Sequence, residues 1–182
     1  MALKQAYDRE FGWKAANFAL EGVDGRTYSL ADMRGEKATL VMFICNHCPY
    51  VQAIIDRLVD HVGQLKAHGV GAVAIMSNNT ENYPEDSFDN MKRFAKAHKF
   101  CFPYVIDRTQ NVAREYGAVC TPDFFGFNVK DELQFRGRLD ESKTALVPNA
   151  RPELLEAMTA IAETGKGPQE QTPSVGCSIK WR

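Results

Sequence analysis

Ala38-Thr39-Leu40-Val41-Met42-Phe43-Ile44-Cys45-Asn46-His47-Cys48-Pro49-Tyr50 is the stretch of sequence that decides the fold. Residues 38–44 are an apolar run of the kind that fills the centre of a sheet, and a cysteine follows at once. From Cys48 to Leu65, apolar residues recur in steps of three and four, which predicts one face of a helix. A second apolar run, residues 70–77, predicts a parallel strand after a right-handed crossover. This strand-helix-strand unit predicts an α/β fold.

The sequence on either side of this unit supplies further elements. Asp24-Gly25 marks a hairpin within residues 17–30. Turn residues and apolar spacing then predict a loop, a helix, a short strand, a short helix, a hairpin and a last helix, at residues 78–86, 86–98, 103–107, 109–116, 123–138 and 151–164. We expect one domain over residues 1–165 and a tail, residues 166–182, whose apolar end docks on that domain.

Composition and charge limit the classes of partner. A chain of 182 residues with 45% hydrophobic and 25% charged residues fits one globular domain. Its formal net charge of -1 gives no electrostatic reason to expect nucleic acid or an anionic membrane as a partner. We expect no secretory signal, because residues 1–10 lack its apolar stretch, and no apolar run elsewhere is long enough to cross a bilayer. Because five cysteines suit a reducing compartment, we expect a cytoplasmic protein whose partners are proteins or small thiols.

Cys45 and Cys48 are the candidate reactive groups. Two cysteines three residues apart on the first turn of a helix lie within the range that a disulfide bridges. The helix N-terminus would lower the pKa of Cys45 below its ordinary value of about 8.5. Cys45 would then attack a substrate disulfide, and Cys48 would resolve the mixed disulfide. The intervening Asn46 and His47 are expected to tune the pKa, since a protonated His47 favours the Cys45 thiolate.

A metal site is the main rival for these thiols, because Cys-X-X-Cys also supplies half of a zinc or iron-sulfur site. The sequence has no second Cys-X-X-Cys, so only the distant Cys120 and Cys177 would complete such a site. The position of the pair between a strand and a helix favours redox chemistry. We therefore expect neither a metal nor another cofactor.

The order of these elements resembles the thioredoxin-like superfamily across nearly the whole chain. The hairpin, the segment Ser29-Leu30-Ala31-Asp32 and the inserted helix resemble its AhpC/TSA (redoxin) branch. Three segments resemble a bacterial subfamily labelled thioredoxin family protein: residues 45–50, 120–125 and 176–181. The resemblance implies a three-layer fold, with helices on both faces of a central mixed sheet. It also implies a thiol-disulfide oxidoreductase that acts on a disulfide-containing protein or a small thiol and has an unidentified electron donor.

The same resemblance assigns roles to residues outside the pair. It implies that Pro122 is a cis-proline facing the cysteines, and that the backbone of Thr121 binds an extended substrate segment. Cys120 is then expected near the pair, as an auxiliary thiol or as a small apolar residue of the strand. Cys177 is either a further resolving thiol on a docked tail or an exposed, incidental thiol.

The sequence also departs from the patterns that it resembles. Ile44 stands where thioredoxins usually have Trp, and Thr39 or Met42 falls near the place of their buried acid. The His-containing pair resembles disulfide isomerases and oxidants, so the direction of electron flow stays open. A peroxiredoxin-like peroxidase ranks second, because residues 38–45 lack the proline of a Pro-x-x-x-Thr-x-x-Cys segment.

Overall fold

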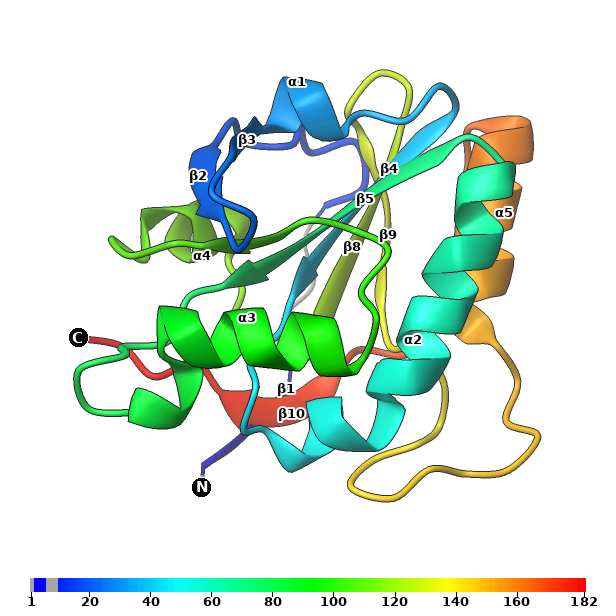
Figure 1. Ribbon diagram of the computed structural model, residues 1–182. Coiled ribbons are helices and arrows are strands. Elements are labelled where there is room, and N and C mark those ends of the chain that lie inside the picture. The colour runs from blue at the N-terminus through cyan, green and yellow to red at the C-terminus, as the bar shows by residue number, and fades with distance from the viewer. Residues whose placement is uncertain (1, 6–9) are drawn as a thin grey trace.

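A computed structural model describes residues 2–5 and 10–182. The strands of its main sheet are β2 Ala19–Gly22, β3 Thr27–Ser29, β4 Ala38–Phe43, β5 Val70–Met76, β6 Tyr104–Ile106, β8 Asp123–Asn128 and β9 Leu133–Gly137. Their order across the sheet is β3-β2-β6-β5-β4-β8-β9 (Figure 1). β6, β5 and β4 are parallel, the adjoining β2 and β8 are antiparallel to them, and β3 and β9 pair antiparallel with β2 and β8. The expected mixed sheet and N-terminal hairpin are confirmed.

Helices cover both faces of this sheet. α2 Pro49–Ala67, α3 Phe88–Ala97 and α5 Glu153–Thr164 pack on one face, and α1 Leu30–Met33 and α4 Asn111–Tyr116 on the other (Figure 1). Alternate residues of β4 explain both layers, because Leu40 and Met42 join the first apolar cluster whereas Val41 and Phe43 join the second. The fold therefore has the three layers that the sequence predicts.

The crossover from β4 to β5 sets the position of the cysteines. β4 and β5 pair in parallel from Ala38↔Val70 to Phe43↔Ile75, and α2 lies between them in the chain. α2 begins at Pro49, with Cys48 as its N-cap, because proline is favoured in the first turn, where its missing N–H costs nothing. The expectation that both cysteines lie on the first helical turn is therefore wrong. They lie in the segment that leads from β4 into the helix.

The C-terminal tail adds a second, smaller sheet. β10 Val175–Ser178 lies between β1 Leu3–Gln5 and β7 Cys120–Thr121, antiparallel to both. Cys177 is opposite Thr121 in this register. Figure 1 shows β10, in red, below the end of the main sheet where α2 begins. The end of the tail thus lies against the domain, while the proposed boundary at residue 165 stays a prediction.

None of the helices within the described ranges is long and apolar enough to cross a membrane.

Candidate functional site

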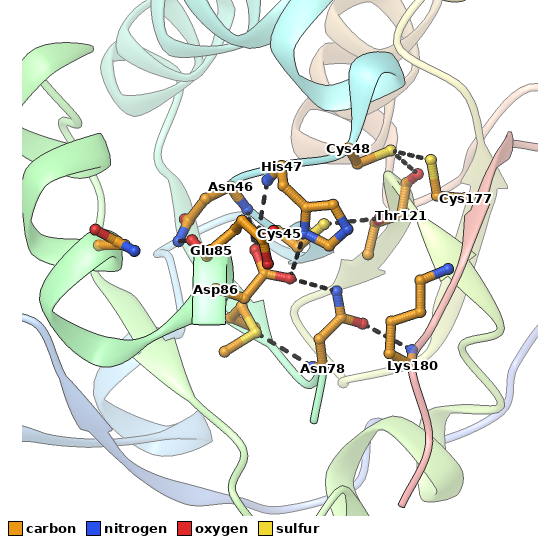
Figure 2. Close-up of polar contacts among 12 residues, drawn as sticks. Cys45, Asn46, His47, Cys48, Asn78, Glu85, Asp86, Thr121, Cys177 and Lys180 are labelled. Atoms are coloured by element: carbon orange, nitrogen blue, oxygen red, sulfur yellow. Dashed lines mark hydrogen bonds and ion pairs between the residues drawn. The ribbon is translucent and has the colours of Figure 1, made fainter. Parts of the chain in front are cut away.

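The cysteine pair is buried in the segment between β4 and α2, among the polar groups that Figure 2 shows. Cys45 and Cys48 are 1% and 0% exposed. The Sγ of Cys45 lies 3.3 Å from the hydroxyl oxygen of Thr121, and the Sγ of Cys48 lies 3.1 Å from the Thr121 carbonyl oxygen. The peptide bond from Thr121 to Pro122 is cis. The structure thus places Thr121 beside both sulfurs and confirms the expected cis-proline.

Asp86 is the site residue that sequence reasoning missed. Its side chain has no exposed surface, although an isolated buried charge is strongly unfavourable unless it is paired and hydrogen-bonded. Its Oδ1 accepts the backbone N–H of Asn46 at 2.8 Å, and its Oδ2 accepts the side-chain N–H of Asn78 at 2.7 Å. Asp86 does not cap the helix that follows, because Ser87 is the N-cap of α3. The carboxylate instead holds the backbone of the cysteine segment.

His47 connects this carboxylate to the surface. Its Nδ1 lies 2.7 Å from Oδ2 of Asp86, although the N–H direction is too bent for a regular hydrogen bond, so the contact is an ion pair when His47 is protonated. Contact with Asp86 raises the pKa of His47 above its ordinary value, against the opposing effect of burial. Its ring stacks on Tyr83, with the ring centroids 5.9 Å apart. A positive charge at His47 is therefore favoured close to the two sulfurs.

The pKa values of the two thiols move in opposite directions. Interaction with the Cys48 thiol, together with burial and the charge of Asp86, raises the pKa of Cys45 well above its ordinary value. The same interaction lowers the pKa of Cys48 to about 5, although burial opposes this, and contacts with Cys177 contribute. The expected low pKa of Cys45 is therefore wrong for the reduced pair. Because α2 begins at Pro49, Cys48 is the cysteine at the helix N-terminus.

Asn46 is placed by contacts with its side-chain amide. This amide donates to the carbonyl oxygen of Glu85 at 3.1 Å and accepts from the hydroxyl of Tyr104 at 2.9 Å. These contacts hold the segment between the cysteines. Its expected role in tuning the thiol pKa stays a prediction.

The two auxiliary thiols have different surroundings. The Sγ of Cys177 lies 2.8 Å from the Sγ of Cys48, and Cys177 is 4% exposed, so the expectation of an exposed thiol is wrong. Cys120 is fully buried, and its sulfur contacts the Pro122 carbonyl oxygen at 3.7 Å. Burial raises the pKa of Cys120. Of the two, the structure brings only Cys177 into contact with the pair.

The tail also occupies the backbone expected to bind substrate. β10 pairs with β7 so that Cys177 is opposite Thr121. Consequently, the backbone edge at Thr121 is taken by a strand of the same chain. The expected role of Thr121 in binding substrate stays a prediction.

One cluster has the composition of a metal site. Suitable atoms of Cys45, His47 and Asp86 all lie within 4.8 Å of one another. This set differs from the four cysteines that the sequence suggested. The oxygens of Asp86 already accept N–H groups from Asn46 and Asn78. The observed contacts thus satisfy the carboxylate without an ion.

Comparisons with known proteins place the fold. A crystal structure of an uncharacterized conserved protein from Geobacillus kaustophilus is 42% identical, with a TM-score of 0.94 over 100% of this chain and 97% of that chain. The thioredoxin domain of a thiol-disulfide oxidoreductase from Bacteroides vulgatus is 18% identical, with a TM-score of 0.60 over 75% of this chain and 91% of that chain. This second similarity shows the thioredoxin-like fold.

Sequence relatives carry two kinds of name. Thiol-disulfide oxidoreductase ResA from Halalkalibacterium halodurans is 28% identical over 67% of this chain, which spans 65% of the length of that relative. A putative peroxiredoxin from Mycobacterium tuberculosis is 24% identical over 75% of this chain and 82% of the relative. Residues 11–137 match the AhpC/TSA family, which is more than half of the chain. The chain therefore belongs to the AhpC/TSA family.

Proposed function

We propose that this protein is a thiol-disulfide oxidoreductase whose redox pair is Cys45 and Cys48. One observation carries the proposal: at the junction of β4 and α2 both sulfurs contact Thr121, Cys45 at its hydroxyl oxygen (3.3 Å) and Cys48 at its carbonyl oxygen (3.1 Å), beside the cis peptide bond to Pro122. Two cysteines so placed can alternate between dithiol and disulfide without refolding. The name of the relative from Halalkalibacterium halodurans supports the same activity.

The contacts suggest how the reduced pair is activated. Cys48 holds the negative charge and Cys45 the proton in the resting pair, as their pKa directions require. Transfer of that proton from Cys45 to Cys48 makes Cys45 the thiolate and Cys48 the thiol. Cys45 then attacks a substrate disulfide, forms a mixed disulfide and releases one substrate thiolate. Cys48 loses its proton to that thiolate and attacks Cys45, which releases the second substrate sulfur.

His47 and its surroundings are suited to assist this exchange. His47 borders a surface hollow that is also lined by Ala2, Asn82, Tyr83, Glu85, Ser178, Ile179, Lys180 and Trp181. Substrate that enters this hollow meets the imidazole before it meets the buried sulfurs. A protonated imidazole stabilises thiolates nearby, which favours the reduced pair and makes its disulfide more oxidising.

Redox titration with glutathione tests the proposal. The purified protein is equilibrated at a series of potentials, its thiols are trapped, and its disulfides are mapped by mass spectrometry. We expect a reversible Cys45–Cys48 disulfide in the wild type and in Cys101→Ser. Cys101→Ser is a matched control, because the Cys101 sulfur of the wild type contacts the Val59 carbonyl oxygen. Cys45→Ser and Cys48→Ser should each abolish turnover of a model disulfide. Thiols that stay reduced at every potential, or that are blocked by a bound metal, would refute the proposal.

Peroxidase activity is a second candidate, favoured by the putative peroxiredoxin among the relatives. In that reaction the Cys45 thiolate would attack a hydroperoxide and become a sulfenic acid, which Cys48 would condense to a disulfide with loss of water. Consumption of hydrogen peroxide by the reduced protein, followed in wild type and Cys45→Ser, separates the two candidates. The control is Cys101→Ser whose Cys45 and Cys48 thiols have been blocked. A peroxidase should consume hydrogen peroxide far faster than this control does.

The finer properties of the protein are also proposals. Its substrate is a disulfide-containing protein or a small thiol, and an electron donor of the thiol class returns the pair to the dithiol. The measured potential will show whether the protein reduces, isomerises or forms disulfides. A cytoplasmic location stays a prediction, which cell fractionation tests.

A further inference from the structure

We infer that Cys177 is a third redox residue, which takes over the disulfide from Cys45 by exchange at Cys48. The inference rests on the proposed function of the Cys45–Cys48 pair and extends it to the tail. It assigns to β10 a chemical role in addition to its structural one.

The positions of the three sulfurs carry the inference. The sulfur of Cys48 is 2.8 Å from that of Cys177, and Cys48 and Cys45 both contact Thr121, at its carbonyl and hydroxyl oxygens. All three residues are at least nine-tenths buried. Thiol-disulfide exchange requires an attacking sulfur in contact with one sulfur of an existing disulfide. Cys177 meets this requirement at Cys48, the inner sulfur of the pair.

The backbone of the tail fixes Cys177 in this position. β10 pairs with β7, and the N–H of Ile179 donates to the carbonyl oxygen of Val119 at 3.0 Å. Gly176 permits the close approach, because a Cβ at this residue would collide with the carbonyl oxygen of Thr121. The side chain of Ile179 is 3% exposed and packs in the second apolar cluster. Cys177 is therefore held by residues on both sides of it.

Asn78 links the tail to the active segment. Its side-chain oxygen accepts the backbone N–H of Lys180 at 2.9 Å, and its amide donates to Asp86 at 2.7 Å. Gln110 also donates to the Lys180 carbonyl oxygen, at 2.8 Å. Figure 2 shows Lys180 and Asp86 on opposite sides of Asn78. The tail and the cysteine segment are thus positioned by one shared amide.

Cys120 shows that burial alone does not give this role. It is the neighbour of Thr121 in β7, and its side chain is as deeply buried as that of Cys48. Because side chains alternate along a strand, Cys120 points away from the face on which Thr121 meets the pair. Its sulfur contacts the carbonyl oxygen of Pro122. Cys177 differs by its contact with the sulfur of Cys48.

The proposed step is a redox-neutral exchange. In the oxidised protein the Cys177 thiolate attacks the Sγ of Cys48. The Cys48–Cys177 bond forms as the Cys45–Cys48 bond breaks, and the electron pair leaves on the Sγ of Cys45. The proton lost by Cys177 is taken up by the Cys45 thiolate. No external oxidant is consumed. Cys45 is again available as a thiol, while the disulfide is retained between Cys48 and Cys177.

Disulfide mapping in Cys45→Ser tests the inference directly. This variant lacks the Cys45–Cys48 disulfide but keeps the two sulfurs that are 2.8 Å apart. Titration with oxidised glutathione should give an intramolecular Cys48–Cys177 disulfide as the main product. A Cys48–glutathione mixed disulfide with a reduced Cys177 would overturn the inference. That result leaves the proposed function intact if the wild type still forms Cys45–Cys48, so the two failures are distinguishable.

A second variant tests whether the position of β10 is responsible. Gly176→Ala should push the strand away from Thr121 without removing a sulfur. In the Cys45→Ser background it should lower the yield of Cys48–Cys177 about tenfold, because the displaced thiol loses effective concentration. Gly63→Ala, where a Cβ meets nothing within 4 Å, is the matched control and should leave the yield unchanged. An equal yield in both variants would contradict the assigned role of β10.

Discussion

Asp86 and Asp123 are two carboxylates with no exposed side-chain surface, in two regions of the molecule, and their partners differ. Asp123 faces Arg136, whose Nη2 lies 2.8 Å from its Oδ2. Asp86 faces His47 and the backbone of the cysteine segment. Arginine keeps its charge at every relevant pH, whereas histidine changes charge near neutrality. Equal burial thus gives a fixed ion pair in one region and a titratable one in the other.

The groups around the two ion pairs also differ, so the two carboxylates should affect different properties of the protein. The guanidinium of Arg136 lies over the ring of Phe125 and also donates to the Gly117 carbonyl oxygen at 2.9 Å. Burial raises the pKa of Asp123 to about 6, although Arg136 lowers it. These groups join β8, β9 and the end of α4, so their effect is on stability. The Asp86 region contains the sulfurs, so its effect should be on the redox potential as well.

The largest effect is expected from breaking the fixed ion pair. Arg136→Met leaves Asp123 buried without its cation and should reduce the free energy of unfolding by about 3–5 kcal/mol. Urea denaturation measures the loss. Arg138→Met is the matched control, because its ion pair with Glu153 is partly exposed and should contribute about 1 kcal/mol or less. Equal losses in the two variants would show that burial does not distinguish the pairs.

Removal of the Asp86 charge should affect stability less than loss of the Asp123–Arg136 ion pair does, and should have a larger effect on the titration of neighbouring groups. Asp86→Asn disturbs buried hydrogen bonds to Asn46 and Asn78 and should cost about 1–3 kcal/mol. It should also lower the pKa of His47 and of Cys45, because Asp86 raises both. NMR titration of the His47 ring and thiol alkylation rates against pH measure these changes.

Asp56→Asn is the control for Asp86→Asn. Asp56 is a largely exposed carboxylate whose Oδ1 lies 2.7 Å from Nδ1 of His98. This variant should change stability by about 0.5 kcal/mol or less and leave the thiol titration unaltered. If His47 titrates identically in Asp86→Asn and the wild type, the ion pair assigned to Asp86 is wrong.

The ion pair of His47 with Asp86 also predicts that the free energy of unfolding depends on pH. The pKa of His47 is raised in the folded state, chiefly by Asp86, so its contribution is complete below the ordinary histidine pKa of about 6.5. That contribution is lost as the pH rises through the folded pKa of His47. Burial lowers the pKa of His61, which has the opposite effect on stability. The difference in stability between wild type and His47→Gln should therefore shrink on going from pH 5.5 to more alkaline pH, and a constant difference would contradict this.

The parts of the fold that the sequence predicts are those set by local pattern. The apolar run of β4 and the helical spacing of α2 predict the crossover, because each depends on residues close in sequence. The same pattern places two cysteines at its junction. Even there, the pattern misses the start of α2 at Pro49 and therefore assigns the low pKa to the wrong cysteine.

The parts that the sequence does not predict are contacts between distant segments. Asp86 reaches Asn46 across 40 residues, and Cys177 reaches Cys48 across 129. A lone acid in a polar loop and a lone cysteine in a tail have no periodic pattern that indicates which face they occupy. β1, which pairs with β10, is likewise too short to be predicted from its own residues. Resemblance to a family supplied the cis-proline, which the local sequence does not indicate.

The smallest effect is expected from a change that alters the site without changing its charge. Tyr104→Phe removes the hydroxyl that donates to Asn46 at 2.9 Å, and a buried hydrogen bond of this kind contributes about 1 kcal/mol. Tyr28→Phe, in the exposed hairpin, is the control for loss of a tyrosine hydroxyl. Because Tyr104 is uncharged, its loss should shift the redox potential less than Asp86→Asn does. A larger shift in Tyr104→Phe would mean that segment geometry, rather than the charge of Asp86, controls the potential of the cysteine pair.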